Sequence, residues 1–255
     1  MKKIFLSILT AGLISSFLVA EEYQYRSEFI YCNLNDGKTI DDAVKDSKVY
    51  GEFVKQVGSK YKQYILVPMH AGETKYDYIL WGTWPDGQAM YEEWGSYLND
   101  FDESFISIDE DDGQESAGKC YSRIAMFNNG VTYNKVEKSL WDKRTPIQFA
   151  GCKLKSGATL ESVHESIIQG SQKAADYGFS GWGRNTFVPY MGFNQDYPYD
   201  FVDMIFWSSF KSRGFMAKNY QDYINSNPGV DSGYSDLASC GPSKSFYVEK
   251  LFSNF

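Results

Sequence analysis

The stretch CNLNDGKTI, residues 32–40, returns in similar form as CKLKSGATL at residues 152–160. Four positions of the first copy recur 120 residues later, namely Cys32, Leu34, Gly37 and Thr39. Each copy ends a run of alternating residues, turns at a glycine and places a threonine where a helix is expected to begin. Two similar units in one chain explain this pattern, and we predict a tandem duplication.

Further matches extend the similarity along both halves of the chain. VP at residues 67–68 recurs at 188–189, and we match DYILW at 77–81 with DMIFW at 203–207. MYEEWGSYLN, which begins at Met90, is matched with MAKNYQDYIN, which begins at Met216. The shift grows from 120 to 126 residues, which we attribute to short loop insertions in the second unit.

Hydrophobic periodicity predicts the elements of each unit. In the first unit we expect strands at about 25–34, 63–69 and 76–84, helices from about 40 and at about 88–98, and a last strand from near Cys120. Thr39 followed by Asp42 has the spacing of a capping box at the start of the first helix. The order strand, helix, strand, strand, helix, strand suits a ferredoxin-like antiparallel sheet.

The four cysteines agree with this topology. In a ferredoxin-like sheet the end of the first strand lies beside the start of the last strand. Cys32 and Cys120 hold these two places in the first unit, Cys152 and Cys240 hold them in the second, and both pairs are 88 residues apart. Of the three pairings that four cysteines allow, we predict disulfides Cys32–Cys120 and Cys152–Cys240.

With this element order and duplication, the chain resembles the dimeric α/β-barrel superfamily over most of residues 23–252. The resemblance implies an α+β fold in which two tandem ferredoxin-like βαββαβ units form a pseudo-dimeric α/β barrel, with their sheets face to face. The superfamily includes cofactor-independent monooxygenases, lactone isomerases, polyketide cyclases, and haem enzymes of the dye-decolorising peroxidase and chlorite dismutase type. We expect a signal peptide at 1–20, a first unit at 21–128, a linker at 129–146 and a second unit at 147–255.

The first twenty residues have the features of a secretory signal. Lys2 and Lys3 form a positive start, residues 4–19 are mainly apolar, and Ala20 is a small residue suited to cleavage. A transmembrane anchor is the alternative, but the apolar stretch is short and acidic residues follow it. We expect a periplasmic or secreted protein that has no membrane anchor after the signal is cleaved.

Charge and composition narrow the partners. The chain has a formal net charge of −8, and loss of Lys2 and Lys3 with the signal makes the mature protein more acidic still. Such a protein repels polyanions, so we expect no nucleic-acid partner and no binding to anionic membrane surfaces. Aromatic residues make up 17% of the chain. A small neutral, aromatic or cationic ligand is the expected partner.

Strand alternation suggests residues for a ligand cavity between the two sheets. On the matched third strands, Asp77 and Trp81 of the first unit and Asp203 and Trp207 of the second are expected to face this cavity. Further candidates from neighbouring strands are Tyr31, Asn33, Lys153 and His70. In such a place an aspartate would bind the ligand or act as a general base. The structural alternative is that the aspartates cap loops and the tryptophans fill the core.

The sequence offers little support for a metal or a cofactor. It has two histidines, His70 and His164, and His164 lies near an apolar stripe of its expected helix, as a structural histidine would. Eight acidic residues fall between Asp100 and Glu115, but the spacing of their glycine does not fit a calcium loop, so we expect a solvated acidic loop. We expect no metal site and no cofactor.

We therefore predict an exported small-ligand-binding protein with a cavity between its two sheets. The first alternative is an enzyme of the same fold, a cofactor-independent monooxygenase or isomerase, with a haem protein as a less favoured form. The second alternative is a structural module that uses its surfaces only for cohesion. No motif in the sequence specifies a reaction.

Overall fold

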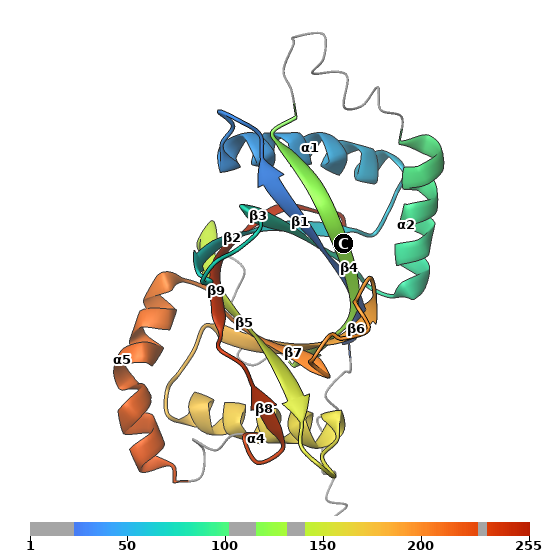
Figure 1. Cartoon of the computed structure of the whole chain (residues 1–255). Helices are drawn as coiled ribbons and strands as arrows, with labels where there is room; N and C mark the ends of the chain where they lie inside the picture. Colours follow the sequence, from blue (N-terminus) through green and yellow to red (C-terminus); the bar gives the residue numbers. More distant parts are fainter. Residues whose placement is uncertain (1–22, 102–115, 132–140, 229–233) are drawn as a thin grey trace, which may run out of the picture.

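The computed structural model describes residues 23–101, 116–131, 141–228 and 234–255. In these ranges eight long strands form a barrel with two helices on each of two opposite sides (Figure 1). The expected signal peptide and nearly all of the expected acidic loop lie outside the described residues.

The elements of the first half are β1 (Tyr23–Leu34), α1 (Ile40–Gln56), β2 (Lys62–His70), β3 (Tyr78–Trp84), α2 (Gly87–Asp100) and β4 (Gly118–Val131). Those of the second half are β5 (Arg144–Leu154), α4 (Leu160–Asp176), β6 (Trp182–Met191), β7 (Phe201–Trp207), α5 (Phe210–Ser226), β8 (Ala238–Cys240) and β9 (Lys244–Ser253).

The barrel is closed by hydrogen bonding between its first and last strands. The order is β7-β6-β4-β1-β3-β2-β9-β5, and β5 pairs again with β7, while the short β8 extends from β5. Every pairing is antiparallel, including β4 with β6 and β2 with β9, where the halves of the chain meet. The prediction of a mixed fold with an antiparallel sheet is confirmed. The predicted barrel is present, but its strands do not form two separate sheets lying face to face, because the edge strands pair and make one continuous barrel.

The nine-residue stretch that occurs twice forms the same local structure in both places. Gly37 and Gly157 adopt φ of 76° and 81°, values that favour glycine because it lacks a Cβ. Thr39 and Thr159 then begin α1 and α4 as N-caps. Both threonines form capping boxes, and the partner of Thr39 is Asp42, so the predicted cap is confirmed.

Both predicted disulfides are confirmed. Cys32 of β1 lies opposite Cys120 of β4, and Cys152 of β5 lies opposite Cys240 of β8. Each bridge joins residues 88 positions apart. A crosslink over so long a loop restricts the unfolded chain, and its stabilising effect is about 4 kcal/mol.

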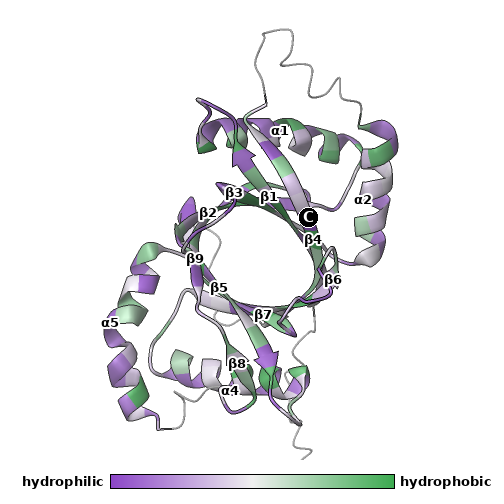
Figure 2. Ribbon diagram, viewed as in Figure 1, coloured by the Kyte–Doolittle hydropathy of each residue, from purple (hydrophilic) through white to green (hydrophobic). Residues whose placement is uncertain are grey.

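Aromatic side chains fill the interior of the barrel. Phe29 stacks on Trp81 at a ring-centroid distance of 6.0 Å, and Tyr64 stacks on the same indole at 4.8 Å. Phe187 and Phe149 meet Phe29 edge to face at 5.4 and 6.0 Å. Figure 2 shows hydrophobic residues recurring along the barrel strands and frequent hydrophilic residues on the outer helices. The space in which we expected a ligand is therefore occupied by a packed core.

The helices cover the outside of the barrel, with α1 and α2 over one half and α4 and α5 over the other (Figure 1). Among the described residues, no helix is long and apolar enough to cross a membrane. β4 continues to Val131 and β5 begins at Arg144, so the two strands extend into both ends of the predicted linker of 129–146.

Candidate functional site

The third strands of the two halves show why the predicted cavity residues do not lie together. Cys32 lies opposite Tyr78 across β1 and β3, whereas Cys152 lies opposite Phe201 across β5 and β7. Tyr78 therefore corresponds to Phe201, a shift of 123 residues rather than the 126 that we matched. The error of three residues is odd, and an odd slip along a strand exchanges its two faces.

The two predicted tryptophans accordingly lie on opposite sides of the barrel wall. Trp81 points inward, and its Nε1 donates to Ser27 Oγ at 3.2 Å. Trp207 points outward and packs under the helices of the second half, where its Nε1 donates to Met216 Sδ. The true counterpart of Trp207 is Trp84, which is fully buried under α1 and α2.

The two predicted aspartates also have different roles. Asp77 is exposed and accepts a hydrogen bond from the backbone N–H of Leu34 at 2.8 Å, so it caps a loop. Asp200 accepts the same bond from Leu154 at 2.7 Å and is its real counterpart. Asp203 is buried on the outer face of the barrel. The structural alternative for the aspartates therefore holds at Asp77.

The remaining predicted residues do not form a common site either. Tyr31 is half-buried, with its ring 5.1 Å from that of Tyr76, while Asn33, Lys153 and His70 are exposed. His164 lies on α4, and its Nε2 is 2.5 Å from Thr186 Oγ1 of β6. The described residues contain no group of three or more histidine, cysteine, aspartate or glutamate side chains arranged to hold a metal.

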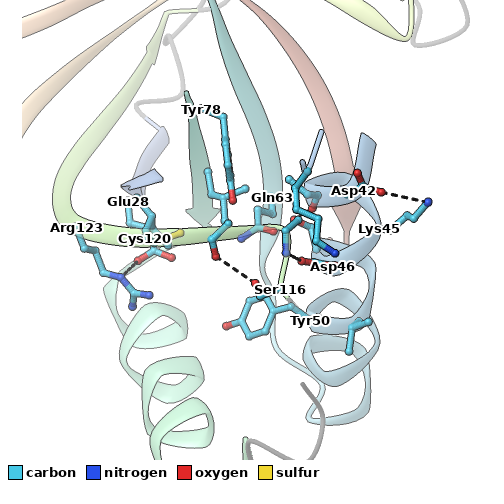
Figure 3. Close-up of a pocket in the computed structure, with 18 of the residues that line it drawn as sticks. Glu28, Asp42, Lys45, Asp46, Tyr50, Gln63, Tyr78, Ser116, Cys120 and Arg123 are labelled. Atoms are coloured by element: carbon cyan, nitrogen blue, oxygen red, sulfur yellow. Dashed lines mark hydrogen bonds and ion pairs between the residues drawn. The ribbon is translucent and has the colours of Figure 1, made fainter. Parts of the chain in front are cut away.

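A cavity of about 510 Å³ lies elsewhere, on the outside of the barrel, between its wall and the helices of the first half. Its polar residues come from several elements (Figure 3). Glu28 of β1 and Arg123 of β4 lie together at one side, and Asp42, Lys45 and Asp46 of α1 lie at the other. The first disulfide reaches the same cavity through Cys120.

Glu28 is the most deeply placed charge in this cavity. It is 4% exposed, since the alternation of β1 turns it outward, toward the helices, on the same face as Cys32. Tyr61 Oη donates to Glu28 Oε1 at 2.9 Å, and Gln63 Nε2 donates to that Tyr61 oxygen at 3.3 Å. Arg123 Nε lies 3.5 Å from Glu28 Oε2. The carboxylate is thus positioned by Tyr61, which directly precedes β2, and by Arg123 of β4.

A glycine makes this arrangement sterically possible. Gly82 lies opposite Glu28 in the pairing of β1 with β3. A Cβ built on Gly82 would come within 2.1 Å of Tyr61 Oη and 2.4 Å of its ring. The missing side chain therefore leaves room for the tyrosine that donates to Glu28.

Two buried acceptors in the cavity have no hydrogen-bond partner among the described residues. They are Glu28 Oε2 and Gln63 Oε1, and Gln63 is 3% exposed. An unsatisfied buried polar atom costs about 1–3 kcal/mol. A buried group left unsatisfied in a native fold calls for an explanation, and a bound molecule that supplies the missing donors is one.

A second buried carboxyl group, that of Glu93, contacts a residue of the cavity lining. Glu93 of α2 is 2% exposed and accepts a hydrogen bond from Tyr50 Oη of α1, which itself lines the cavity. Burial raises the pKa of Glu93 to about 7, although the hydrogen bond from Tyr50 opposes this rise. Burial also raises the pKa of Glu28, against the effect of Arg123. Both carboxyl groups are therefore held in surroundings that disfavour their ionised form.

The equivalent place in the second half is built differently. A cavity of about 360 Å³ lies there between the barrel wall, α4 and α5. Arg184 occupies the position equivalent to Gln63 and Asp203 the position equivalent to Leu80. The two form a bidentate pair, with both N–H···O distances 2.7 Å, and Tyr234 Oη adds a bond of 3.0 Å to Asp203. The buried ions of this half hydrogen-bond to each other, whereas Glu28 Oε2 and Gln63 Oε1 accept no hydrogen bond from the described residues.

Sequence reasoning missed the residues of the first cavity. One signal was present in β1, where Glu28 shares the strand face of Ile30 and Cys32. A charge among residues that face the core is the informative exception to hydrophobic burial. Tyr61, Arg123 and Glu93 carried no comparable signal, because they approach Glu28 only in the folded barrel.

Comparison with known proteins does not identify a family for this chain. No protein-family model matches the sequence, and no curated protein is similar to it. Solved structures of chlorite dismutase from Candidatus Nitrospira defluvii are similar in shape. A doubly substituted mutant has a TM-score of 0.47 and 10% identity, with coverage of 89% of this chain and 92% of that chain. A mutant in complex with cyanide has a TM-score of 0.48 and 12% identity, with coverage of 91% of this chain and 92% of that chain. A complex with imidazole has a TM-score of 0.47 and 10% identity, with coverage of 91% of this chain and 93% of that chain.

Proposed function

We propose that the protein is an exported small-ligand-binding protein and that its ligand occupies the cavity between β1, β2, α1 and α2. The observation that carries this proposal is a pair of buried acceptors that have no hydrogen-bond partner among the described residues, Gln63 Oε1 and Glu28 Oε2, the latter 3.5 Å from Arg123 Nε. The volume of about 510 Å³ is within the range of small-molecule sites. The site differs from the one we expected between two sheets, since that space holds the aromatic core.

Export is supported by the amino-terminal sequence and by the disulfides. A basic start, an apolar stretch and a small residue at position 20 fit a secretory signal. Two disulfides are typical of proteins that fold in an oxidising compartment. We propose a periplasmic or secreted location for the mature protein.

The barrel is proposed to consist of two tandem ferredoxin-like units that arose by duplication. The strand order β4-β1-β3-β2 of the first half has its counterpart in β9-β5-β7-β6 of the second. The disulfides and threonine caps fall at equivalent places. In this account the first unit carries the ligand site, and the second has an internal ion pair where the ligand would bind.

Native mass spectrometry tests the proposed function. Protein purified from its native host is expected to retain a small molecule at one copy per chain. A Glu28→Gln variant is expected to lose it, because the substitution replaces a charged acceptor with a neutral amide of the same shape. Asp77→Asn, which alters an exposed loop cap outside the cavity, is the matched control and should keep the ligand. Retention of the ligand by Glu28→Gln would refute the site.

An enzyme is the second candidate, and one observation favours it. Glu28 is a buried carboxyl with a raised pKa that lines a cavity, which is what a general base requires. The two candidates are separated by incubating the retained molecule with fresh protein and analysing it by mass spectrometry. Recovery of the molecule unchanged supports binding alone, and conversion into a product supports catalysis.

A further inference from the structure

The chemistry of the cavity lining bears on the kind of ligand that fits, and this step rests on the proposed function. Among the described residues, the lining contains three acidic side chains, Glu28, Asp42 and Asp46, and three basic ones, Lys38, Lys45 and Arg123. The formal charges of this described lining are therefore balanced, although the whole chain has a net charge of −8.

The arrangement of these charges disfavours a charged ligand. Glu28 and Arg123 face each other at 3.5 Å, so a cation bound at Glu28 also meets the guanidinium, and an anion bound at Arg123 also meets the carboxylate. On α1, Lys45 lies 3.4 Å from Asp42 in the same way. Like charges brought together in a partly desolvated site are costly. A neutral ligand avoids both conflicts.

The hydrogen-bonding groups require a ligand that donates. Glu28 Oε2 and Gln63 Oε1 accept no hydrogen bond from the described residues, and neither has a proton to give when Glu28 is ionised. Arg123 borders the same space and offers only N–H donors. A hydroxyl group both donates and accepts, so it satisfies either side. Several hydroxyl groups on one small molecule would serve all three residues.

The rest of the lining suits the non-polar face of such a molecule. Tyrosine rings contribute at four positions, and aliphatic side chains complete the wall. These residues are Tyr50, Tyr61, Tyr78, Tyr97, Ile30 and Leu80. Sites for small ligands combine aromatic and apolar surface with a few convergent polar groups. A sugar ring presents C–H groups on one face and hydroxyl groups at its edge, which matches this division.

We infer that the first-half cavity binds a neutral polyhydroxylated ligand, a sugar or a sugar alcohol, whose hydroxyl groups donate to Glu28 and Gln63 and accept from Arg123. The second-half cavity lacks this capacity, because Asp203 and Arg184 are already bound to each other. Binding is therefore expected at one site per chain.

Isothermal titration calorimetry with charge-matched sugars tests this inference. The probes are glucose, galactose and mannose, each beside its 2-amino and its uronic acid counterpart, together with the corresponding hexitols. At least one neutral probe is expected to bind with a stoichiometry of one. Its amino and uronic acid counterparts are expected to bind at least about 10-fold more weakly, because each adds a charge that the balanced lining opposes. A charged counterpart that binds as tightly as the neutral probe, or a panel in which nothing binds, overturns the inference.

Two variants tie the binding to the named acceptors. Glu28→Gln and Gln63→Leu are each expected to weaken the neutral probe by about 10-fold or more, since hydrogen bonds to buried groups are lost. Asp77→Asn is the control and is expected to bind normally. Far-ultraviolet circular dichroism and thermal unfolding check that each variant is folded, and normal binding by a folded Glu28→Gln protein contradicts the assignment.

Failure of the inference and failure of the proposed function give different results. A retained non-sugar molecule that Glu28→Gln releases leaves the binding function intact and refutes the sugar. Absence of any retained molecule, together with no binding across the panel, refutes both.

Discussion

Single side chains decide whether a buried polar group in this barrel is structural or available for binding. Asp203 has both oxygens occupied by Arg184 and a further bond from Tyr234. Glu28 has one oxygen bound by Tyr61 and the other without a hydrogen-bond partner among the described residues. Because an unsatisfied group costs stability, this difference supports the proposal that Glu28 interacts with a ligand.

The Asp203–Arg184 pair is predicted to serve stability alone. Asp203→Ala leaves a buried guanidinium without its partner, and we expect a loss of about 3–5 kcal/mol in unfolding free energy. Replacing Arg184 with Met in the same protein is expected to restore part of that loss, because no unpaired charge then remains. Urea unfolding measures both variants. The double variant is expected to have a higher unfolding free energy than Asp203→Ala, and a double variant that is no more stable contradicts the pairing.

Glu93 is predicted to make stability depend on pH. Its pKa is about 7 in the folded protein against 4.5 for a free glutamate, so the folded state binds the extra proton between these values. The contribution of Glu93 to the free energy of unfolding is therefore greatest below pH 4.5. It falls as the pH rises to about 7, by up to about 3 kcal/mol. Glu93→Gln cannot titrate, so its unfolding free energy is expected to fall less over that interval. Equal pH dependence in the two proteins would show that Glu93 is not the titrating group.

At the scale of elements, short-range patterns predicted much and long-range ones less. The caps at Thr39 and Thr159, the strand order and both disulfides follow from local spacing and from the ferredoxin-like order. The face of β7 was predicted wrongly, since the match of DYILW to DMIFW was displaced by three residues. The outer cavity could not be predicted, because it depends on how far α1 and α2 stand from the barrel wall.

Gly82 of β3 provides a test of how one strand positions another. Gly82→Ala places a Cβ against the ring of Tyr61, and we expect a loss of about 1–3 kcal/mol together with weaker ligand binding. Gly95→Ala on α2 is the control, since nothing lies within 4 Å of its added Cβ. In a helix this second change is expected to be neutral or stabilising by up to about 1 kcal/mol. Thermal unfolding compares the two, and an unaffected Gly82→Ala protein would contradict the close contact.

At the scale of the whole molecule, each half carries its own crosslink, and the halves are joined by strand pairing, by a shared aromatic core and by side-chain contacts such as that of Arg144 with Asp41. Cys32→Ser with Cys120→Ser, or the same change at Cys152 and Cys240, is expected to cost about 4 kcal/mol in each case. Mass spectrometry of tryptic peptides without reduction is expected to find no bridge between the halves. A bridge that links Cys32 or Cys120 to either cysteine of the second half would contradict the fold.

The central claim is that the ligand lies outside the barrel wall and not within it. Ser27 and Glu28 are neighbours on β1 that point to opposite sides, since Ser27 bonds to Thr83 within the barrel and Glu28 faces the outer cavity. Native mass spectrometry of protein from the native host, carried out on Ser27→Ala and Glu28→Gln, compares the two sides directly. We predict that Ser27→Ala retains the ligand and Glu28→Gln loses it. Loss in Ser27→Ala with retention in Glu28→Gln would place the ligand inside the barrel and contradict this account.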